Sequence, residues 1–184
     1  MRIAVSGTHS VGKSTLICEF LRAHPEFAHE AEPYEVLVEE FGEEFAAEPG
    51  VEDFRRQLDF NIERLAQHPP GAKVIYERCP LDFLAYIQGL QSNSDETLAD
   101  EITNALRNLD LIVYLPLDES DAEFPKLRRA VDRRLSAIYR EDQFELPDTL
   151  TIIEATGSTA QRLRTLESYT SNTQPSDASQ RITS

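Results

Sequence analysis

The residues best suited to chemistry stand near the start of the chain, where positions 7–15 read Gly-Thr-His-Ser-Val-Gly-Lys-Ser-Thr. This spacing matches G-x-x-x-x-G-K-[ST], the phosphate-binding P-loop pattern. Its glycines permit backbone angles closed to other residues, and the loop N–H groups can then surround an anion at the start of a helix. The predicted nucleotide-binding residues are Gly7, Thr8, His9, Ser10, Val11, Gly12, Lys13, Ser14 and Thr15.

Two side chains of this loop have predicted roles in phosphate chemistry. Lys13 offers a compact positive charge to the β- and γ-phosphates, and the Ser14 hydroxyl is a suitable ligand for Mg²⁺. The flanking sequence supports the motif, because Arg2–Ser6 is β-rich and residues 16–22 continue as an amphipathic helix. A chance match would lack this strand–loop–helix frame, so the chain is predicted to bind a nucleoside triphosphate.

A second chemical group follows an apolar run at residues 73–76, where Glu77 and Arg78 come directly before a helix opened by Pro80. Ligands of open α/β sheets bind beyond the carboxyl ends of the strands. Glu77 can there hold Mg²⁺ or its water shell, and Arg78 can neutralise phosphate oxygens. Alternatively, the two side chains pair with each other at the surface. Asp82 could reach the same site, but we favour its interpretation as a first-turn acid that stabilises the helix dipole.

The elements that must position these residues alternate along the chain. Predicted strands are Arg2–Ser6, 27–32, 73–78, 110–117 and 150–157, and predicted helices are Lys13–Ala23, 34–45, 52–67, 81–90, 95–107, Lys126–Arg140 and 160–169. Such alternation predicts a parallel sheet covered on both faces. The expected fold class is α/β, a P-loop NTPase three-layer sandwich with a five-stranded parallel sheet in the order 2-3-1-4-5.

Composition excludes several classes of protein. A net charge of −15 over 184 residues argues against a nucleic-acid binder or a protein of anionic membranes. No apolar run approaches the ~20 residues of a membrane span, and the predicted strand at Arg2 leaves no room for a signal peptide. Cys18 and Cys79 need no disulfide. We therefore expect a cytoplasmic protein.

The chain resembles the P-loop nucleoside and nucleotide kinases, and deoxynucleoside kinases in particular. The resemblance covers about residues 1–90 and rests on the P-loop and on Glu77-Arg78 after the third strand. It also rests on Glu32-Pro33 after the second strand and on Gln57 placed seven residues before Arg64. The chain is similar as well to the small ATPase domains related to nicotinamide riboside kinase.

This resemblance implies roles for three further residues. Glu32 would act as the base toward the acceptor hydroxyl, or it is simply one solvated acid among several. Gln57 would read the acceptor, although an exposed position on the helix is the more common outcome. Gly157 would let the backbone approach the adenine ring, or the turn is a plain strand-to-helix connection with Ser158 as N-cap.

The resemblance also implies domain limits and a lid. Residues 1–170 would form the kinase-like domain with a lid at about 118–141, and residues 171–184, rich in Ser, Thr and Asn, would form a disordered tail. Four arginines gather in the lid, and we expect at least one of Arg128, Arg129, Arg133 and Arg134 to stabilise phosphate charge. The predicted catalytic lid residues are Arg128 and Arg129, although pairs such as Arg128 with Asp132 can also serve the helix itself.

The leading hypothesis is therefore phosphoryl transfer from ATP, with Mg²⁺, to a hydroxyl of a small molecule, by Lys13, Glu32, Glu77, Arg78 and a lid arginine. Residues 32–53 contain no Lys or Arg, which favours a neutral acceptor such as a nucleoside or nicotinamide riboside over a nucleotide. A homodimer is possible. The alternative is a regulatory P-loop ATPase acting through a protein partner, and a nucleotide-binding module without catalysis is a third reading. No Asn-Lys-x-Asp guanine motif of a GTPase occurs.

Overall fold

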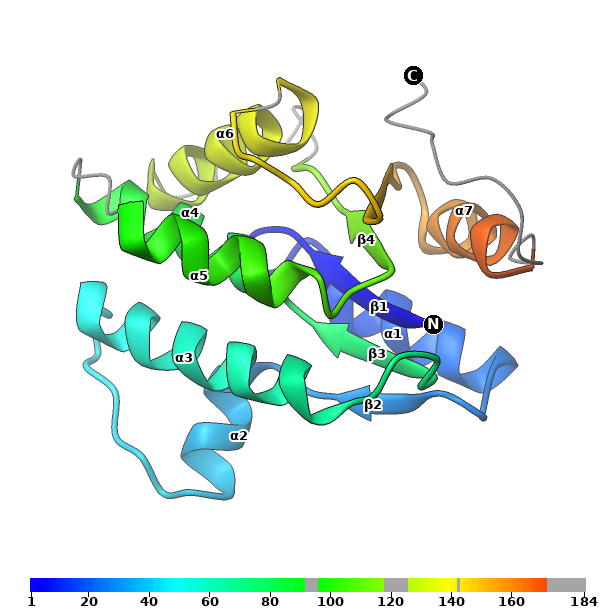
Figure 1. The fold of residues 1–184 in the computed structure, drawn as a ribbon, viewed down its shortest axis with the longest axis horizontal. Coiled ribbons are helices and arrows are strands. Elements are labelled where there is room, and N and C mark those ends of the chain that lie inside the picture. The colour runs from blue at the N-terminus through cyan, green and yellow to red at the C-terminus, as the bar shows by residue number, and fades with distance from the viewer. Residues whose placement is uncertain (92–95, 118–125, 142, 172–184) are drawn as a thin grey trace.

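Five strands form one parallel sheet at the centre of the molecule (Figure 1). The computed structural model describes residues 1–91, 96–117, 126–141 and 143–171. The strands are β1 Arg2–Ser6, β2 Ala28–Glu30, β3 Val74–Glu77, β4 Leu111–Tyr114 and β5 Thr151–Glu154. Their order is β2-β3-β1-β4-β5, and every neighbouring pair is parallel. The predicted fold class and strand order are confirmed. In this register Val5 lies level with Glu77, so β1 and β3 end side by side.

Helices cover both faces of the sheet. They are α1 Lys13–Ala23, α2 Pro33–Glu39, α3 Val51–Gln67, α4 Pro80–Leu90, α5 Glu96–Leu106, α6 Lys126–Arg140 and α7 Thr159–Ser171. Alternate residues of a strand point to opposite faces, so Ile3 and Val5 pack with the buried side chains of α1 and α7. Ala4 belongs to the second core, which α3, α4, α5 and α6 complete. The carboxyl ends of the strands are thereby left for a site.

The second predicted helix is shorter than expected. It was predicted over 34–45 but ends at Glu39, because the chain turns at Gly42 with a φ of 68°. Across this turn the Glu43 N–H donates to the carbonyl of Leu37 at 2.9 Å, which folds the chain back onto the helix. Amphipathic pattern alone did not reveal this stop.

Two predicted segments fall partly outside the described residues. The N-terminal part of the predicted lid, residues 118–125, lies outside them, whereas its C-terminal part is α6. The final helix α7 extends to Ser171, and the rest of the predicted tail, residues 172–184, lies outside the described residues.

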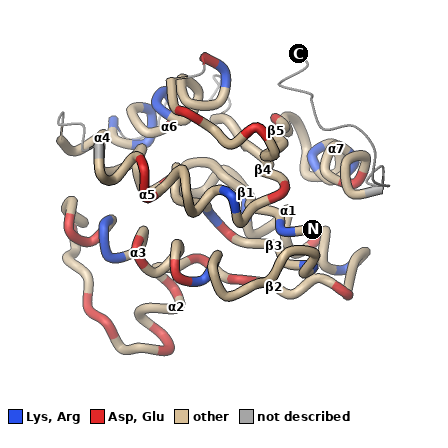
Figure 2. Tube along the Cα trace, in the orientation of Figure 1, with Lys and Arg blue, Asp and Glu red and all other residues tan. Residues whose placement is uncertain are grey.

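Charged residues are unevenly distributed over this fold (Figure 2). Acidic residues gather along α2, the segment that links it to α3, and α3 itself, whereas α6 carries several basic residues. In the part of the chain that the structure describes, no helix is both long and apolar enough to cross a bilayer. Because the chain as a whole is acidic, the phosphate-binding loop needs positive charge of its own close by.

Candidate active site

The loop between β1 and α1 has the backbone form that the P-loop pattern demands. Gly7 has a φ of 148° and Gly12 a φ of 93°, values that favour glycine. A Cβ on Gly7 would lie 2.6 Å from the carbonyl oxygen of Leu115 and 2.9 Å from Cγ2 of Val11. Only glycine fits there, because the loop passes directly against the chain that leaves β4.

A buried carboxylate holds the start of this loop. Oδ1 of Asp82 accepts hydrogen bonds from the Gly7 N–H at 2.8 Å and from the Ser6 hydroxyl at 3.0 Å. Its Oδ2 accepts from the Cys79 N–H at 2.8 Å, which caps the first turn of α4. Asp82 was interpreted as a simple helix-dipole acid, so its contact with the loop was missed. In the sequence its only signal was its position two residues after Pro80.

Helix α6 reaches the same point through Tyr139. The Tyr139 hydroxyl donates to Oγ of Ser6 at 2.8 Å, and Sγ of Cys79 lies 3.4 Å from the Tyr139 oxygen. Burial raises the pKa of the Cys79 thiol and of the Tyr139 hydroxyl, so both stay neutral in the physiological range. Cys18 and Cys79 are both free thiols.

The loop lysine is almost completely buried. Lys13 is 3% exposed and its Nζ donates to the carbonyl of Thr8 at 3.0 Å. Burial, helped by the charge of Arg78, lowers the pKa of Lys13 to about 8. An ammonium ion with so little water around it would interact strongly with an added phosphate.

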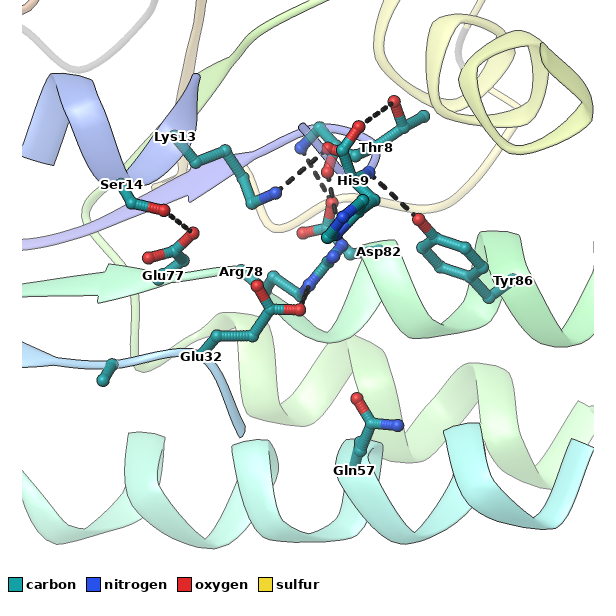
Figure 3. Close-up of polar contacts among 12 residues, drawn as sticks. Thr8, His9, Lys13, Ser14, Glu32, Gln57, Glu77, Arg78, Asp82 and Tyr86 are labelled. Carbon is teal, nitrogen blue, oxygen red and sulfur yellow. Dashed lines mark hydrogen bonds and ion pairs between the residues drawn. The ribbon is translucent and has the colours of Figure 1, made fainter. Parts of the chain in front are cut away.

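Ser14 and Glu77, the two predicted metal ligands, face each other. The Ser14 hydroxyl donates to Oε1 of Glu77 at 2.8 Å, and Glu77 is buried at the end of β3 (Figure 3). One hydroxyl and one carboxylate are oxygen ligands of the kind that Mg²⁺ takes, with water and phosphate completing its octahedron. Within the described residues no group of three or more His, Cys, Asp and Glu could hold a metal alone. These two residues therefore fit Mg²⁺ only when phosphate shares it.

Arg78 is the most constrained residue of the site. It has a φ of 76°, which is uncommon outside glycine, and its side chain is buried. Its Nε donates to Oε1 of Glu32 at 2.7 Å, and its Nη1 donates to the carbonyl of Gly7 at 3.3 Å. Burial opposes the charge on Arg78, but the Glu32 carboxylate outweighs it and raises the pKa of the guanidinium.

Glu32 stands at the start of α2, two residues after the end of β2, and there binds Arg78, which follows β3. Burial alone would raise the pKa of Glu32, but the charges of Arg78 and Lys13 outweigh it and hold that pKa below its ordinary value. The structure therefore brings Glu32, Arg78 and Lys13 into one charge network. It does not leave Glu32 as a solvated surface acid.

Aromatic rings form the wall beyond this network. The Tyr86 hydroxyl accepts from the His9 N–H at 3.1 Å, the Arg78 guanidinium lies 5.4 Å from the centre of the Tyr86 ring, and Phe54 stacks on Tyr86 with ring centres 4.6 Å apart. Gln57 extends from α3 toward this region (Figure 3) and is 4% exposed. The expectation that Gln57 is an exposed helix residue is wrong, because α3 turns this face inward.

The arginines of α3 are all paired with acids. Arg55 binds Asp59 and Glu101, Arg56 binds both carboxylate oxygens of Glu43, and Arg64 binds Glu30 together with the carbonyl of Ala31. These are the only basic residues of α3, and each guanidinium is already neutralised by a partner. The side of the site opposite the P-loop thus offers little positive charge.

The predicted lid arginines differ in their position on α6. Burial lowers the pKa of the His9 imidazole, and the charge of Arg128 acts in the same direction, so Arg128 influences the loop. Arg129 is exposed. Asp132, proposed as an ion partner of Arg128 within the helix, accepts instead from the Tyr114 hydroxyl and the Leu117 N–H, both at 3.0 Å. This contact ties α6 to the end of β4.

The last helix adds a residue that no motif indicated. Nη1 of Arg162 on α7 donates to the carbonyl of Val11 at 2.5 Å, and a Cβ on Gly12 would lie 3.2 Å from the same nitrogen. Gly157, with a φ of 80°, stands in the turn that leads to this helix. In that turn Oε1 of Gln161 accepts from the N–H of Ser158 at 2.8 Å. These contacts support the alternative in which this segment is a plain strand-to-helix connection.

Comparisons with known proteins agree with this architecture. The sequence matches a family described as an AAA domain over residues 2–162. Deoxyadenosine kinase from M. mycoides has a TM-score of 0.60 at 14% identity, over 93% of this chain and 99% of that one. Thymidylate kinase from Candida albicans reaches 0.64 at 17% identity, over 99% and 97%. NadR protein, in complex with NR, reaches 0.60 at 16% identity, over 92% of this chain but 50% of NadR.

At these identities the likeness establishes a P-loop kinase-like fold, and the resemblance drawn from the motifs is confirmed at that level. No curated protein sequence matches the chain. The roles of individual residues must be argued from the geometry above.

Asp82 supplies a first prediction. Asp82→Asn replaces one accepting oxygen with an NH₂ group that faces N–H donors, so we expect a loss of about 2–3 kcal/mol in the free energy of unfolding. Nucleotide binding should weaken too, because the Gly7 N–H loses its orientation. Urea unfolding and titration with a fluorescent ATP analogue measure both effects. Asp100→Asn, the same change at an exposed site on α5, is the control. Equal stability of the two variants would contradict the role of Asp82.

Lys13 supplies a second prediction, on pH. Its folded pKa of about 8 lies below the unfolded value of 10.5, so burying the ammonium costs stability below pH 8. That cost, roughly 3 kcal/mol from the shift, disappears as the pH rises from about 8 to 10.5. Lys13→Met should therefore unfold at higher urea than the parent at pH 7, and this advantage should shrink by pH 10.

The control for this measurement is Lys73→Met, because the Lys73 side chain is 54% exposed. That variant should show no comparable gain at pH 7. A stability difference between Lys13→Met and the parent that stays constant from pH 7 to pH 10 would refute the buried-ammonium explanation.

Proposed function

The chain belongs to a family of AAA domains, and we propose that it is a kinase that transfers a phosphoryl group from ATP to a hydroxyl of a small, neutral, nucleoside-like molecule. The observation that carries this proposal is the ion pair between Arg78 and Glu32, 2.7 Å long, beside the buried Lys13. A carboxylate held by an arginine at this place can accept the proton of an acceptor hydroxyl during transfer.

The residues divide the work of the reaction. Lys13 and the loop N–H groups would hold the β- and γ-phosphates, and Arg78 with Arg128 would offset the charge that develops during transfer. Ser14 and Glu77 would hold Mg²⁺, which neutralises phosphate charge when bound. Arg162, through the carbonyl of Val11, would keep the loop in its binding form.

Glu32 would orient the acceptor. Its Oε1 is bound by Arg78, while Oε2 takes no hydrogen bond from any described residue and can accept one from the acceptor hydroxyl. The acceptor oxygen bonds to the γ-phosphorus, the bond to the β–γ bridging oxygen breaks, and the hydroxyl proton passes to Glu32. Its depressed pKa makes Glu32 a weak base, which suits a loose transition state in which the proton leaves late.

Charge favours a neutral acceptor. The arginines of α3 are paired with Asp59, Glu101, Glu43 and Glu30. An acceptor that carried its own phosphate would meet the acidic surface of α2 and α3 without a free cation on these elements (Figure 2). The ring of Tyr86 with Phe54 and the inward amide of Gln57 suit a flat polar body.

One observation supports an alternative function, that of a regulatory ATPase. Phe41 is 62% exposed within the acidic segment after α2, and Tyr34 is 43% exposed nearby. Exposed aromatic rings among acids suit a basic protein partner, so the alternative is a regulatory ATPase that acts through such a partner rather than on a small acceptor.

One experiment separates the two functions. ADP release from Mg·ATP is measured alone and with nucleosides, nicotinamide riboside and nucleoside monophosphates. The proposal predicts stimulation by a neutral nucleoside or riboside and little by the monophosphates. Slow hydrolysis that no acceptor stimulates would reject the kinase in favour of the ATPase, and stimulation by a monophosphate alone would reject the neutral acceptor.

Glu32 supplies the third prediction. Glu32→Gln keeps an oxygen for Arg78 but removes the basic carboxylate, so transfer should fall by roughly 10²–10⁴-fold. The affinity for the ATP analogue should change little. Glu35→Gln, the same change one turn away at an exposed position, is the matched control and should transfer at the parent rate. If Glu32→Gln transfers phosphate as fast as Glu35→Gln, Glu32 has no catalytic role.

A further inference from the structure

A second concave site lies between α4, α6 and the segment after α6. Its volume is about 320 Å³, within the lower range of sites that hold small molecules. Its wall includes Leu84 and Gln88 of α4, Arg133 and Arg134 of α6, and Gln143 and Phe144 beyond α6. None of these six residues belongs to the phosphate loop or touches it in the contacts described above.

The two sites use different faces of α6. Tyr139 and Asp132 point to the ends of β1 and β4, where they bind Ser6 and Leu117. Successive residues of a helix are turned by about 100°, so Arg133 and Arg134 lie well away from the face of Asp132. The pocket therefore cannot be an extension of the phosphate-binding site.

Among the described residues, Arg133 and Arg134 lack the acidic partner that seven other arginines have. Arginines with a carboxylate partner are Arg2, Arg22, Arg55, Arg56, Arg64, Arg78 and Arg140. Over residues 1–91, 96–117, 126–141 and 143–171, neither Arg133 nor Arg134 has a hydrogen bond or an ion pair. In a chain with 33 acids and 18 basic residues, these two adjacent guanidinium groups are available to an anion.

The rest of the wall suits an organic ligand. Leu84 and Ile138 are each 5% exposed, and the ring of Phe144 packs on the same core. Gln88 and Gln143 supply amides, and Nε2 of Gln143 already donates to Glu141 at 3.0 Å. One side of the pocket is apolar and the other is cationic.

We propose that this pocket binds a small organic anion, with a phosphate or carboxylate on Arg133 and Arg134 and a flat apolar body against Leu84 and Phe144. Guanidinium groups bind such anions through paired, charge-assisted hydrogen bonds. The buried apolar body adds affinity in proportion to its area. This assignment does not depend on the proposed function.

The test uses the full chain labelled with ¹⁵N and three probes. Phenyl phosphate and benzoate carry the two possible anions on a ring, and inorganic phosphate carries the anion alone. Titration should shift the amide signals of α4, α6 and residues near Phe144, with saturation. Phenyl phosphate or benzoate should bind at least tenfold more tightly than inorganic phosphate, and their ratio tells phosphate from carboxylate.

The double variant Arg133→Gln/Arg134→Gln should weaken binding of the better aromatic probe at least tenfold. Arg107→Gln/Arg164→Gln is the matched control, because it removes the same charge at two exposed arginines elsewhere and should bind like the parent. Ala137→Leu, which narrows the pocket without touching charge, should also weaken binding.

Three results would overturn the proposal. The first is a set of shifts confined to residues of the phosphate loop. The second is equal loss of binding in the variant and the control, which would mark a general effect of charge. The third is equal affinity for inorganic phosphate and the aromatic probes, which would remove the apolar half of the site.

Discussion

The position of the phosphate loop depends on the buried carboxylate of Asp82. It accepts the Gly7 N–H, the Ser6 hydroxyl and the Cys79 N–H, and so joins the end of β1, the loop and the first turn of α4. Arg78 lies between β3 and α4, where its unusual φ of 76° is held by the hydrogen bond from its N–H to the carbonyl of Val5 at 3.0 Å. A strained backbone persists only where its surroundings over-determine it, and Asp82 supplies much of that constraint.

The positive charge near the phosphate loop comes from a few buried side chains. In a chain of net charge −15, a polyanionic substrate is repelled at long range. The site overcomes this with a few buried cations at short distance, where water screens them little. Lys13 and Arg78 are two of these buried cations, whereas the guanidinium groups of α3 are neutralised by acids. The two sides thus differ in their cations, because the guanidinium groups of α3 are paired with acids, whereas Lys13 makes no ion pair with any described residue.

The sequence was enough to predict the fold and the phosphate loop, because both depend on local patterns. The parallel sheet followed from the alternation of β and α elements, whereas its strand order followed from the resemblance to P-loop kinases. Glu77 and Arg78 were found because they end an apolar strand. Asp82, Tyr139 and Arg162 were missed as parts of the site. Their contacts with Ser6, Gly7 and Val11 span 75 to 151 residues of sequence, and short-range patterns carry no record of such contacts. Gln57 was misjudged because a polar residue on an amphipathic helix is normally exposed.

The buried Lys13 links stability to binding. Its ammonium makes a hydrogen bond to one carbonyl, that of Thr8, although it has three protons to donate. A triphosphate would supply the missing acceptors and the opposite charge, so part of the binding free energy is the relief of a cost already present in the fold. A ligand that binds only the folded state stabilises it by mass action. The buried ammonium of Lys13 thus costs free energy in the empty site, and a bound phosphate removes that cost. This difference favours the binding of phosphate by a protein that is acidic as a whole.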